Sequence, residues 1–521
     1  MKCLRIQIGL SVLLASAISP ATALSQIPSA PDIPARAIYG SVTATPRPTS
    51  TMLPLSLDEA IHRGLEHNLQ IALATTNQRA AAGERLEAVS YLLPTITWQA
   101  QRSRRQINLE AQGFRPSLLA SFPPGVLTPA QIAGFQPKVT VNEVQANATL
   151  RGTLFDLRSF ELYRAAKQEI RAVDFSFLSV RGAVIQTVAG SYLLALADQA
   201  NVANARGLLA TNAEILRQAT LKHQAGTVAK IDELRARVQY QQQQQAVIAR
   251  QNEFEKSKVA LNREIGLPAD QSIRLTDQTP YAGLQVMPLD QALRLAYANR
   301  QEYLRLQAKL RSAQLQSHAA RYQRLPTLTF TGNYGITGTV GGIYHGTFLA
   351  QGSLNIPLFK EAKFRGDRDV ARAQTAIALA QLASFHTEIE AQIRTSMLDV
   401  SATEQLVTVA RSNVDLVRTS LSDATERFQN GIEDNLPVVQ AQSSLATAQT
   451  QLVNSLYRYD IAKLALARSV GIIDRDYRTY LGPALPAMPP ITSTAALALD
   501  RLGHPRLGVQ PPAEQDQHIG Q

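Results

Sequence analysis

LDEA at residues 57–60 is followed by LPTITW at residues 93–98, and the same pair of motifs returns as LDQA at residues 289–292 and LPTLTF at residues 325–330. In both copies the second motif begins 36 residues after the first. Landmarks that recur in one order at a fixed spacing are typical of a chain built from two copies of one structural unit. The sequence therefore predicts an internal duplication.

Each repeat is expected to run helix, strand, strand, long helix, turn and long helix. The first helix should extend from Asp58 to just before Pro94, with Ser56 as its cap, and in the second repeat from Asp290 to just before Pro326. The expected divisions are a signal peptide (1–23), an extended N-terminal arm (24–54), a first repeat (55–266), a connector (267–288), a second repeat (289–472) and a C-terminal segment that is largely a disordered tail (473–521).

Four segments alternate apolar and polar residues with the period of two that is typical of strands. In the second repeat, for example, Leu328, Phe330, Tyr334 and Ile336 share one face, opposite threonine and asparagine. We expect strands at about 94–104, 139–153, 326–338 and 346–357. The loop between the first two strands is much longer than its counterpart, and we expect it to be extracellular, because the long loops of outer-membrane barrels face outward.

Strands of about ten residues with one apolar face suit the wall of a transmembrane barrel. A soluble antiparallel sheet with one wet face is the alternative. The signal peptide and the lack of a second sheet to pack against favour the barrel. Four strands cannot close a barrel, since about eight are the practical minimum, so several chains must share one; three chains would supply twelve strands.

The segments after the strands carry heptad repeats, which predict long helices packed as coiled coils. Each pair of helices reverses near Gly226 or Gly431 and forms an antiparallel hairpin. The rising helices are expected to pack through Ala195, Val202, Leu209, Leu216 and His223 in the first repeat and Val400, Val407, Val414, Leu421 and Phe428 in the second. The returning helices are expected to pack through Tyr240, Val247, Phe254 and Leu261, and through Leu445, Leu452, Tyr459 and Leu466.

The N-terminus is typical of a secretory signal peptide. Lys2 and Arg5 precede a short apolar stretch, and ATA at 21–23 is a cleavage site. Cys3, the only cysteine, is expected to leave with the signal, so no lipid anchor is predicted. After the signal, no segment is judged long and apolar enough to span a membrane as a helix.

The sequence lacks the patterns of several other function classes. The net charge of +11 is spread along helices without a dense basic block, so no nucleic-acid partner is expected. We find no metalloprotease, phosphate-loop, hydrolase or dinucleotide motif, and predict no catalytic residues, no cofactor and no metal. Glu59 and His62 have metal-ligand spacing, but a solvated helix face explains them, as it does the glutamine-rich run at 239–245.

The turns between the long helices are the candidate functional site. Acidic residues lie just after each turn, and if several chains form a tube these turns meet around one axis. Rings of carboxylates would then form a constriction that attracts cations, and neighbouring Arg and Lys would offset the repulsion within each ring. The predicted gate residues are Asp232, Glu233, Glu433 and Asp434.

The chain resembles the TolC family of outer-membrane channel proteins over about 55–472. The resemblance rests on the paired LD[EQ]A and Leu-Pro motifs, on PLF at 357–359 and on the two glycine turns. It implies a mostly α fold with a small β part, a homotrimer sharing a twelve-stranded barrel in the outer-membrane lipid, and a long α-helical tunnel in the periplasm. It also implies a periplasmic adaptor and an inner-membrane pump as partners. The expected docking residues are Gly226, Thr227, Val228, Gly431 and Ile432.

The resemblance implies the exit duct of a tripartite efflux or type I secretion system, passive and gated at the turns. Two alternatives belong to other classes. A periplasmic coiled-coil adaptor or scaffold would explain the hairpins but not four amphipathic strands. A secreted enzyme with a helical domain would need catalytic groups that the sequence does not show.

Overall fold

The computed structural model describes residues 51–113, 115–119, 128, 130, 134–277 and 282–481. The predicted signal peptide, most of the predicted arm, parts of the long loop and the tail after 481 lie outside the described residues. The chain forms two compact units. The first holds Thr76–Ile170 and His318–Arg368, and the second holds 51–75, Arg171–Ser317 and 369–481 of the described residues. Each unit takes segments from both predicted repeats.

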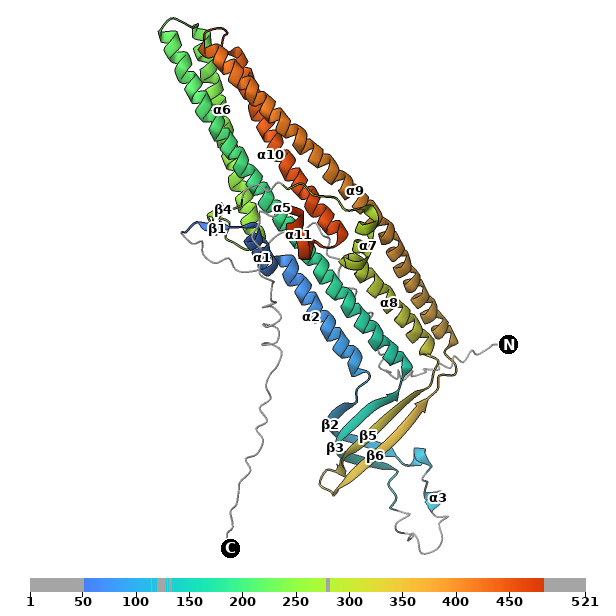
Figure 1. Cartoon of the computed structure of the whole chain (residues 1–521). Coiled ribbons are helices and arrows are strands. Elements are labelled where there is room, and N and C mark those ends of the chain that lie inside the picture. The colour runs from blue at the N-terminus through green and yellow to red at the C-terminus, as the bar shows by residue number, and fades with distance from the viewer. Residues whose placement is uncertain are drawn as a thin grey trace, which may run out of the picture. The chain divides into compact units, whose positions relative to one another are not determined.

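One order of elements occurs twice along the chain (Figure 1). The first series is β1 (Leu53–Leu55), α1 (Leu57–His67), α2 (Leu69–Ser90), β2 (Thr95–Asn108), η1 (Glu110–Gln112), α3 (Pro116–Leu119), β3 (Lys138–Phe155), α5 (Leu157–Gln224), α6 (Lys230–Glu264) and β4 (Ile273–Leu275). The second is α7 (Leu289–Asn299), α8 (Gln301–Tyr322), β5 (Thr327–Thr339), β6 (Tyr344–Asn355), α9 (Glu361–Gln429), α10 (Leu436–Val470) and α11 (Ile473–Leu481).

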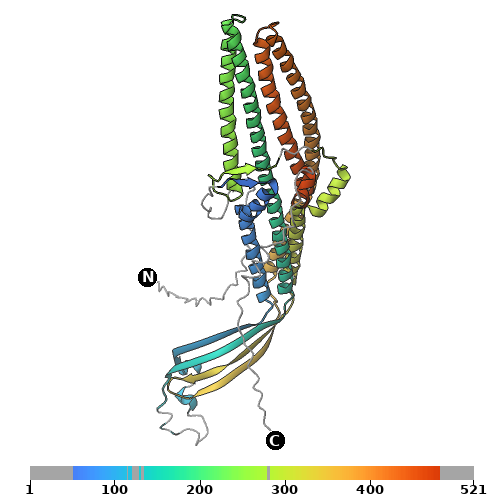
Figure 2. The ribbon, with the colours of Figure 1, turned by 60° about the vertical axis from the view of Figure 1, so that its left-hand side comes forward.

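The first unit contains a four-stranded antiparallel sheet in the order β2-β3-β5-β6 (Figure 2). The predicted alternation fixes which residues share a face. Trp98, Ala148, Tyr334 and Phe348 lie opposite one another across all four strands, and all belong to the apolar face. In the single chain this face is open to solvent, with Trp98 73% and Phe348 82% exposed. Strands β2 and β6 form the two edges.

The second unit is built on the long helices and one hydrophobic core. The core combines α1, α5, α7, α9, α10 and α11 with the two-stranded parallel sheet of β1 and β4. Buried polar contacts fix the segment around β1: the Tyr192 hydroxyl lies 2.7 Å from the Asp277 carboxylate and 3.0 Å from the Leu55 carbonyl, and Asp277 also accepts the Leu57 N–H. As predicted, Ser56 caps α1 by accepting the Glu59 N–H.

The prediction of one unbroken first helix in each repeat was wrong. The chain breaks after His67 into α1 and α2, and after Asn299 into α7 and α8. At each break a residue adopts an extended conformation. The reason is tertiary packing, because a left-handed glycine at the end of a returning helix packs against each break. A Cβ on Gly266 would lie 2.5 Å from His67 Cβ, and one on Gly471 2.8 Å from the Arg300 backbone.

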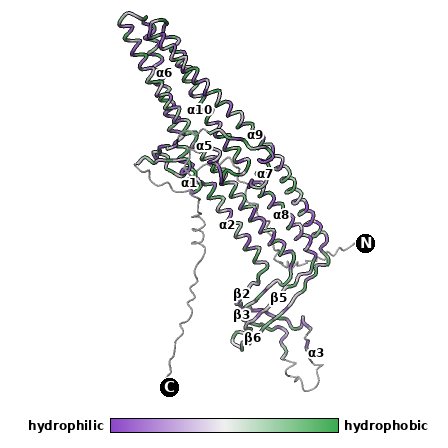
Figure 3. The backbone as a smooth tube through the Cα atoms, viewed as in Figure 1, coloured by the Kyte–Doolittle hydropathy of each residue, from purple (hydrophilic) through white to green (hydrophobic). Residues whose placement is uncertain are grey.

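The heptad prediction is confirmed for α9, whose Val400, Val407, Val414 and Phe428 are buried. Figure 3 shows hydrophobic and hydrophilic residues interleaved along these helices. In α5 the predicted stripe drifts by one residue: Leu208 and Ile215 are buried, whereas Leu209 and Leu216 are only partly buried. A helix of 3.6 residues per turn drifts against a strict heptad, which accounts for the shift. In the glutamine run, Gln243 is buried and donates to the Ala205 carbonyl rather than facing solvent.

Two further predictions need correction. The predicted disordered tail begins with a helix, because α11 buries Tyr477, Tyr480 and Leu481, and both Tyr477 and Arg478 bind the Asp58 carboxylate of the LDEA motif. Among the described residues, α5 contains a window apolar enough to cross a membrane by composition, contrary to prediction. More than half of that window is buried, since α5 supplies much of the core of the second unit.

Candidate functional site at the helical turns

The α5–α6 and α9–α10 turns close with the same backbone motif. Gly226 and Gly431 adopt left-handed φ angles of 74° and 70°. In the first turn the Thr227 N–H donates to the Lys222 carbonyl and the Gly226 N–H to the His223 carbonyl; in the second, Ile432 and Gly431 repeat both bonds. This six-to-one and five-to-two pair is a Schellman motif, which uses glycine because an L side chain is strained at positive φ.

The first turn places its two predicted gate acids inside the hairpin. Asp232 and Glu233 are only 6% and 4% exposed. The Glu233 carboxylate lies 2.6 Å from Lys230 Nζ and 2.8 Å from Arg237, with His223 at 4.0 Å. The Lys230 ammonium in particular lowers the pKa of Glu233, which keeps this carboxylate ionised.

The second turn leaves its acids more open. Glu433 pairs with Arg427 at 3.0 Å, and the Asp434 side chain is 53% exposed. One Asp434 oxygen accepts the Leu436 N–H, which satisfies a free donor at the start of α10. The other Asp434 oxygen lies 3.3 Å from Arg235 of the first hairpin. The predicted acids therefore differ in exposure, and each contacts at least one cation.

Side chains that the sequence analysis did not single out join the two hairpins. Arg235 contacts Asp232 at 3.5 Å as well as Asp434. The buried Asn435 amide donates to the Asp232 carbonyl at 2.6 Å. Lys222 donates to the carbonyls of Phe428 and Gln429 and lies over the Phe428 ring. Lys222 thus satisfies free carbonyls at the C-terminus of α9, where the helix dipole also favours a cation.

Apolar packing beneath the turns supports these polar contacts. Ile215 and Ala219 of α5, Ala236 of α6, and Phe428 and Val438 of the second hairpin form one buried cluster. Sequence signals for the missed residues existed. Arg235 follows Asp232 by three positions on a helix, and Asn435 precedes a helix with Pro at its start, which is a capping pattern.

The predicted docking residues lie at the surface of the turns. A Cβ added at Gly226 or Gly431 would meet no atom within 4 Å, and Ile432 is 68% exposed. The Thr227 hydroxyl donates to the Lys222 carbonyl, and the Val228 carbonyl contacts His223 Nδ1. The turns are therefore ordered internally by their own hydrogen bonds while they present an open apolar and backbone surface.

Neither the turns nor the other described residues hold a group of three or more His, Cys, Asp or Glu arranged for a metal ion. The Glu59 and His62 pattern resolves into separate ion pairs, Glu59 with Arg63 and His62 with Glu66.

Comparison with known families decides what kind of protein carries these turns. The profile of the family described as outer membrane efflux protein matches residues 60–267 and 292–472. The chain belongs to this family. It is therefore an outer-membrane efflux channel protein, located in the outer membrane and extending into the periplasm. The resemblance to the TolC family is confirmed, and the family is one of transport channels rather than enzymes or adaptors.

Individual relatives agree with this assignment. The chain is 27% identical over 362 residues to a probable efflux pump outer membrane protein, SepC of Pseudomonas putida, covering 67% of this chain and 72% of the relative. It is 21% identical to the outer membrane protein TolC of Escherichia coli, covering 67% and 73%. The structure of the outer membrane protein VceC from Vibrio cholerae matches with a TM-score of 0.64 at 18% identity, covering 80% and 96%. The fold is thus that of the TolC-like channels.

Proposed function

We propose that three copies of this chain form a passive exit duct for an inner-membrane pump, gated at the helical turns. The observation that carries the proposal is the sheet of the first unit. Its apolar face is uncovered in the single chain, and both edge strands are unpaired there. Exposed edges and a large apolar face are unfavourable in water, and a shared twelve-stranded barrel in lipid removes both.

The height of the apolar face supports this arrangement. Along β5 the face runs from Leu328 to Ile336. Eight residues at about 3.4 Å each give roughly 27 Å along the strand. At the roughly 40° tilt of outer-membrane strands this corresponds to about 20 Å along the membrane normal, close to the apolar band of about 25 Å found in such barrels.

We further propose that the chain arose by duplication and that the repeats end near 266 and 472. In support, the turn glycines Gly226 and Gly431 and the packed glycines Gly266 and Gly471 share one spacing and one backbone conformation in pairs. The connector between the repeats then includes β4.

In this proposal the four acids have two roles at the gate. Asp232 and Glu233 belong to a latch inside the closed turns, while Glu433 and Asp434 face the lumen. Support for the latch comes from Arg235, which contacts one acid of each hairpin, and from Asn435, which donates across the same junction. Opening would move the hairpins apart and break these contacts.

The adaptor is proposed to dock on the turn surface formed by Gly226, Thr227, Val228, Gly431 and Ile432. The relatives named as components of efflux pumps support a pump and a periplasmic adaptor as partners of this chain as well. Efflux is favoured over type I secretion, because SepC and the toluene efflux protein TtgF of Pseudomonas putida are named for efflux pumps.

Single-channel conductance of the purified protein in planar bilayers tests the duct and the gate. We expect small, cation-selective steps from the wild type. The Arg235→Gln variant should give larger steps because the link between hairpins is lost, and the Glu433→Ala, Asp434→Ala double variant should give larger and less selective steps. Arg217→Gln is the matched control, since Arg217 pairs with Glu214 within α5 alone.

Steps that stay at the wild-type size in Arg235→Gln and in the double variant would retain the duct and reject the gate. Well-folded wild-type protein that never inserts would reject the duct itself.

A further inference from the structure

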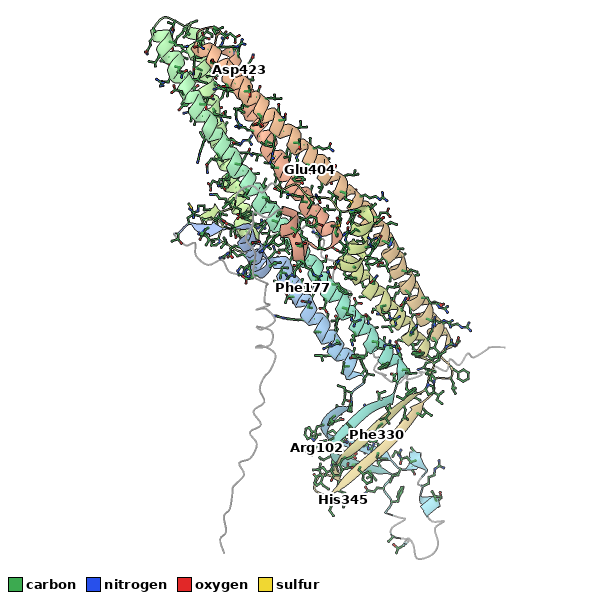
Figure 4. All side chains as sticks on the ribbon, in the orientation of Figure 1. Arg102, Phe177, Phe330, His345, Glu404 and Asp423 are labelled. Carbon is green, nitrogen blue, oxygen red and sulfur yellow. The ribbon has the colours of Figure 1, made fainter. Side chains whose placement is uncertain are left out.

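Two arginines on β2 lie on the face of the sheet that the proposed barrel turns towards lipid. In the register of the sheet, Arg102 is opposite Val144 and Arg104 is opposite Asn142. Both side chains are exposed and continue the row that begins with Ile96, Trp98 and Ala100. Figure 4 marks Arg102 on the sheet.

Their depth places them at a boundary rather than within the apolar band. The row of Arg102 continues through Val144 and Gly338 to Tyr344, two residues beyond the row of Ile336. From Leu328 this row lies about 26 Å along the barrel normal, at the edge of a band about 25 Å tall. Arginine at the midplane of such a band is strongly unfavourable, but near the interface it costs little.

The end of the sheet that carries them is the end away from the helices. The helices of the first unit join β2, β3 and β5 at Thr95, Phe155 and Thr327, whereas Arg102 and Arg104 lie towards the β5–β6 hairpin and the long loop. With the helices in the periplasm, the two arginines reach the outer leaflet.

No carboxylate of the sheet neutralises them. The four strands contain a single acidic residue, Glu143, which lies opposite Ser103 and therefore on the other face. Strand β6, which would adjoin β2 of a neighbouring chain in the barrel, contains no acid. Among the described residues no ion pair is formed by Arg102 or Arg104, and the long loop at 109–137 contributes only Glu110 as an acid.

We propose that Arg102 and Arg104 bind the phosphate groups of lipid A, the phosphorylated glycolipid of the outer leaflet. This inference rests on the proposed barrel. The planar guanidinium donates paired hydrogen bonds to phosphate oxygens, and basic side chains at a membrane boundary select anionic headgroups. Trp98 and Ile96 on the same face would pack against the acyl chains below. The occupant thus matches the face in both charge and polarity.

The test measures lipid A binding to the purified trimer in nanodiscs, with bisphosphorylated and dephosphorylated lipid A as probes and inorganic phosphate as competitor. The Arg102→Gln, Arg104→Gln double variant should bind bisphosphorylated lipid A about tenfold more weakly, while dephosphorylated lipid A binds both proteins alike. Arg105→Gln is the matched control, because Arg105 is the next residue on the same strand and points to the opposite face.

Unchanged binding in the double variant, or an equal loss in Arg105→Gln, would overturn the inference. Full displacement of the lipid by millimolar inorganic phosphate would also overturn it, since the site would then take free phosphate. Arg102→Lys with Arg104→Lys keeps the charges but not the guanidinium forks, and should lose part of the affinity if the glutamine variant does not form trimers; wild-type affinity in that lysine variant would overturn the paired hydrogen bonds. A wild-type protein that conducts but ignores the phosphates fails this inference alone, whereas one that never inserts fails the proposed duct.

Discussion

The two returning helices carry the same three-residue pattern in different surroundings. In α6, Phe254, Glu255 and Lys258 form an ion pair of 2.7 Å with the ammonium over the ring. In α10, Tyr459, Asp460 and Lys463 form the same arrangement at the equivalent positions, again at 2.7 Å. The first pair is partly exposed, with side chains 52% and 18% accessible, whereas the second is completely buried.

The difference comes from what covers each helix. Residues after the first repeat return over α10: Lys463 contacts the Ala282 carbonyl, and the Leu284 N–H donates to the Tyr459 hydroxyl. The same local pattern is therefore a surface pair in one repeat and a core element in the other. Equal geometry does not imply equal energy, because the desolvation of a charge and its screening by water depend on the surroundings.

The largest expected effect is the loss of one partner of the buried pair. Asp460→Ala leaves the Lys463 ammonium buried without its carboxylate, and we expect it to lower the free energy of unfolding by about 3–5 kcal/mol. Glu255→Ala removes an exposed pair and should cost less than about 1 kcal/mol. Unfolding of the detergent-solubilised protein in guanidinium, followed by circular dichroism, measures both. Similar losses in the two variants would refute the contrast.

The packed and open glycines give the next largest difference. Gly471→Ala combines a left-handed φ of 83° with a Cβ only 2.8 Å from the Arg300 backbone. We expect it to cost about 3 kcal/mol, from backbone strain plus overpacking. Gly431→Ala, at an open turn, should cost only about 1 kcal/mol. Thermal unfolding midpoints compare the two directly. A larger loss at Gly431 would show that the turn packs against something the single chain lacks.

Much of this arrangement was predictable from the sequence, and the exceptions have a common cause. The strand alternation gave the correct faces, and the α9 heptads gave the buried stripe, because both depend on local periodicity. The break at Asn68, the order of α11 and the burial of Asp460 depend on distant partners: Gly266 against His67, Asp58 against Tyr477, and Ala282 over Lys463. Local sequence does not encode those contacts.

The candidate site divides in the same way. Glycine turns followed by acids were visible in the sequence, because each lies within a few residues. That Asp232 is buried while Asp434 is exposed, and that Arg235 contacts both, depends on how two hairpins meet. A single sequence gives no distance between segments about two hundred residues apart.

A smaller effect should separate the hydroxyl of the buried cluster from its ring. Tyr459→Phe keeps the ring beneath Lys463 but leaves the Leu284 N–H without its acceptor. We expect a loss of about 1–2 kcal/mol, the cost of an unsatisfied buried donor. Phe254→Tyr, the reverse change in α6, should be close to neutral. Hydrogen exchange of the Leu284 amide reports the contact itself, and its exchange should accelerate only in Tyr459→Phe.

The pH dependence gives the smallest difference between the two pairs. Burial raises the pKa of Asp460 to about 6, because desolvation outweighs the attraction of Lys463. Between the unfolded pKa and this value the folded state binds the extra proton, so stability falls as the pH rises. The expected loss from pH 5 to pH 7 is about 1 kcal/mol. Asp460→Asn should flatten that slope, whereas Glu255→Gln should leave it unchanged. A slope that persists in Asp460→Asn would assign it to another group, and Lys463 would then be neutralised by Asp460 throughout this range.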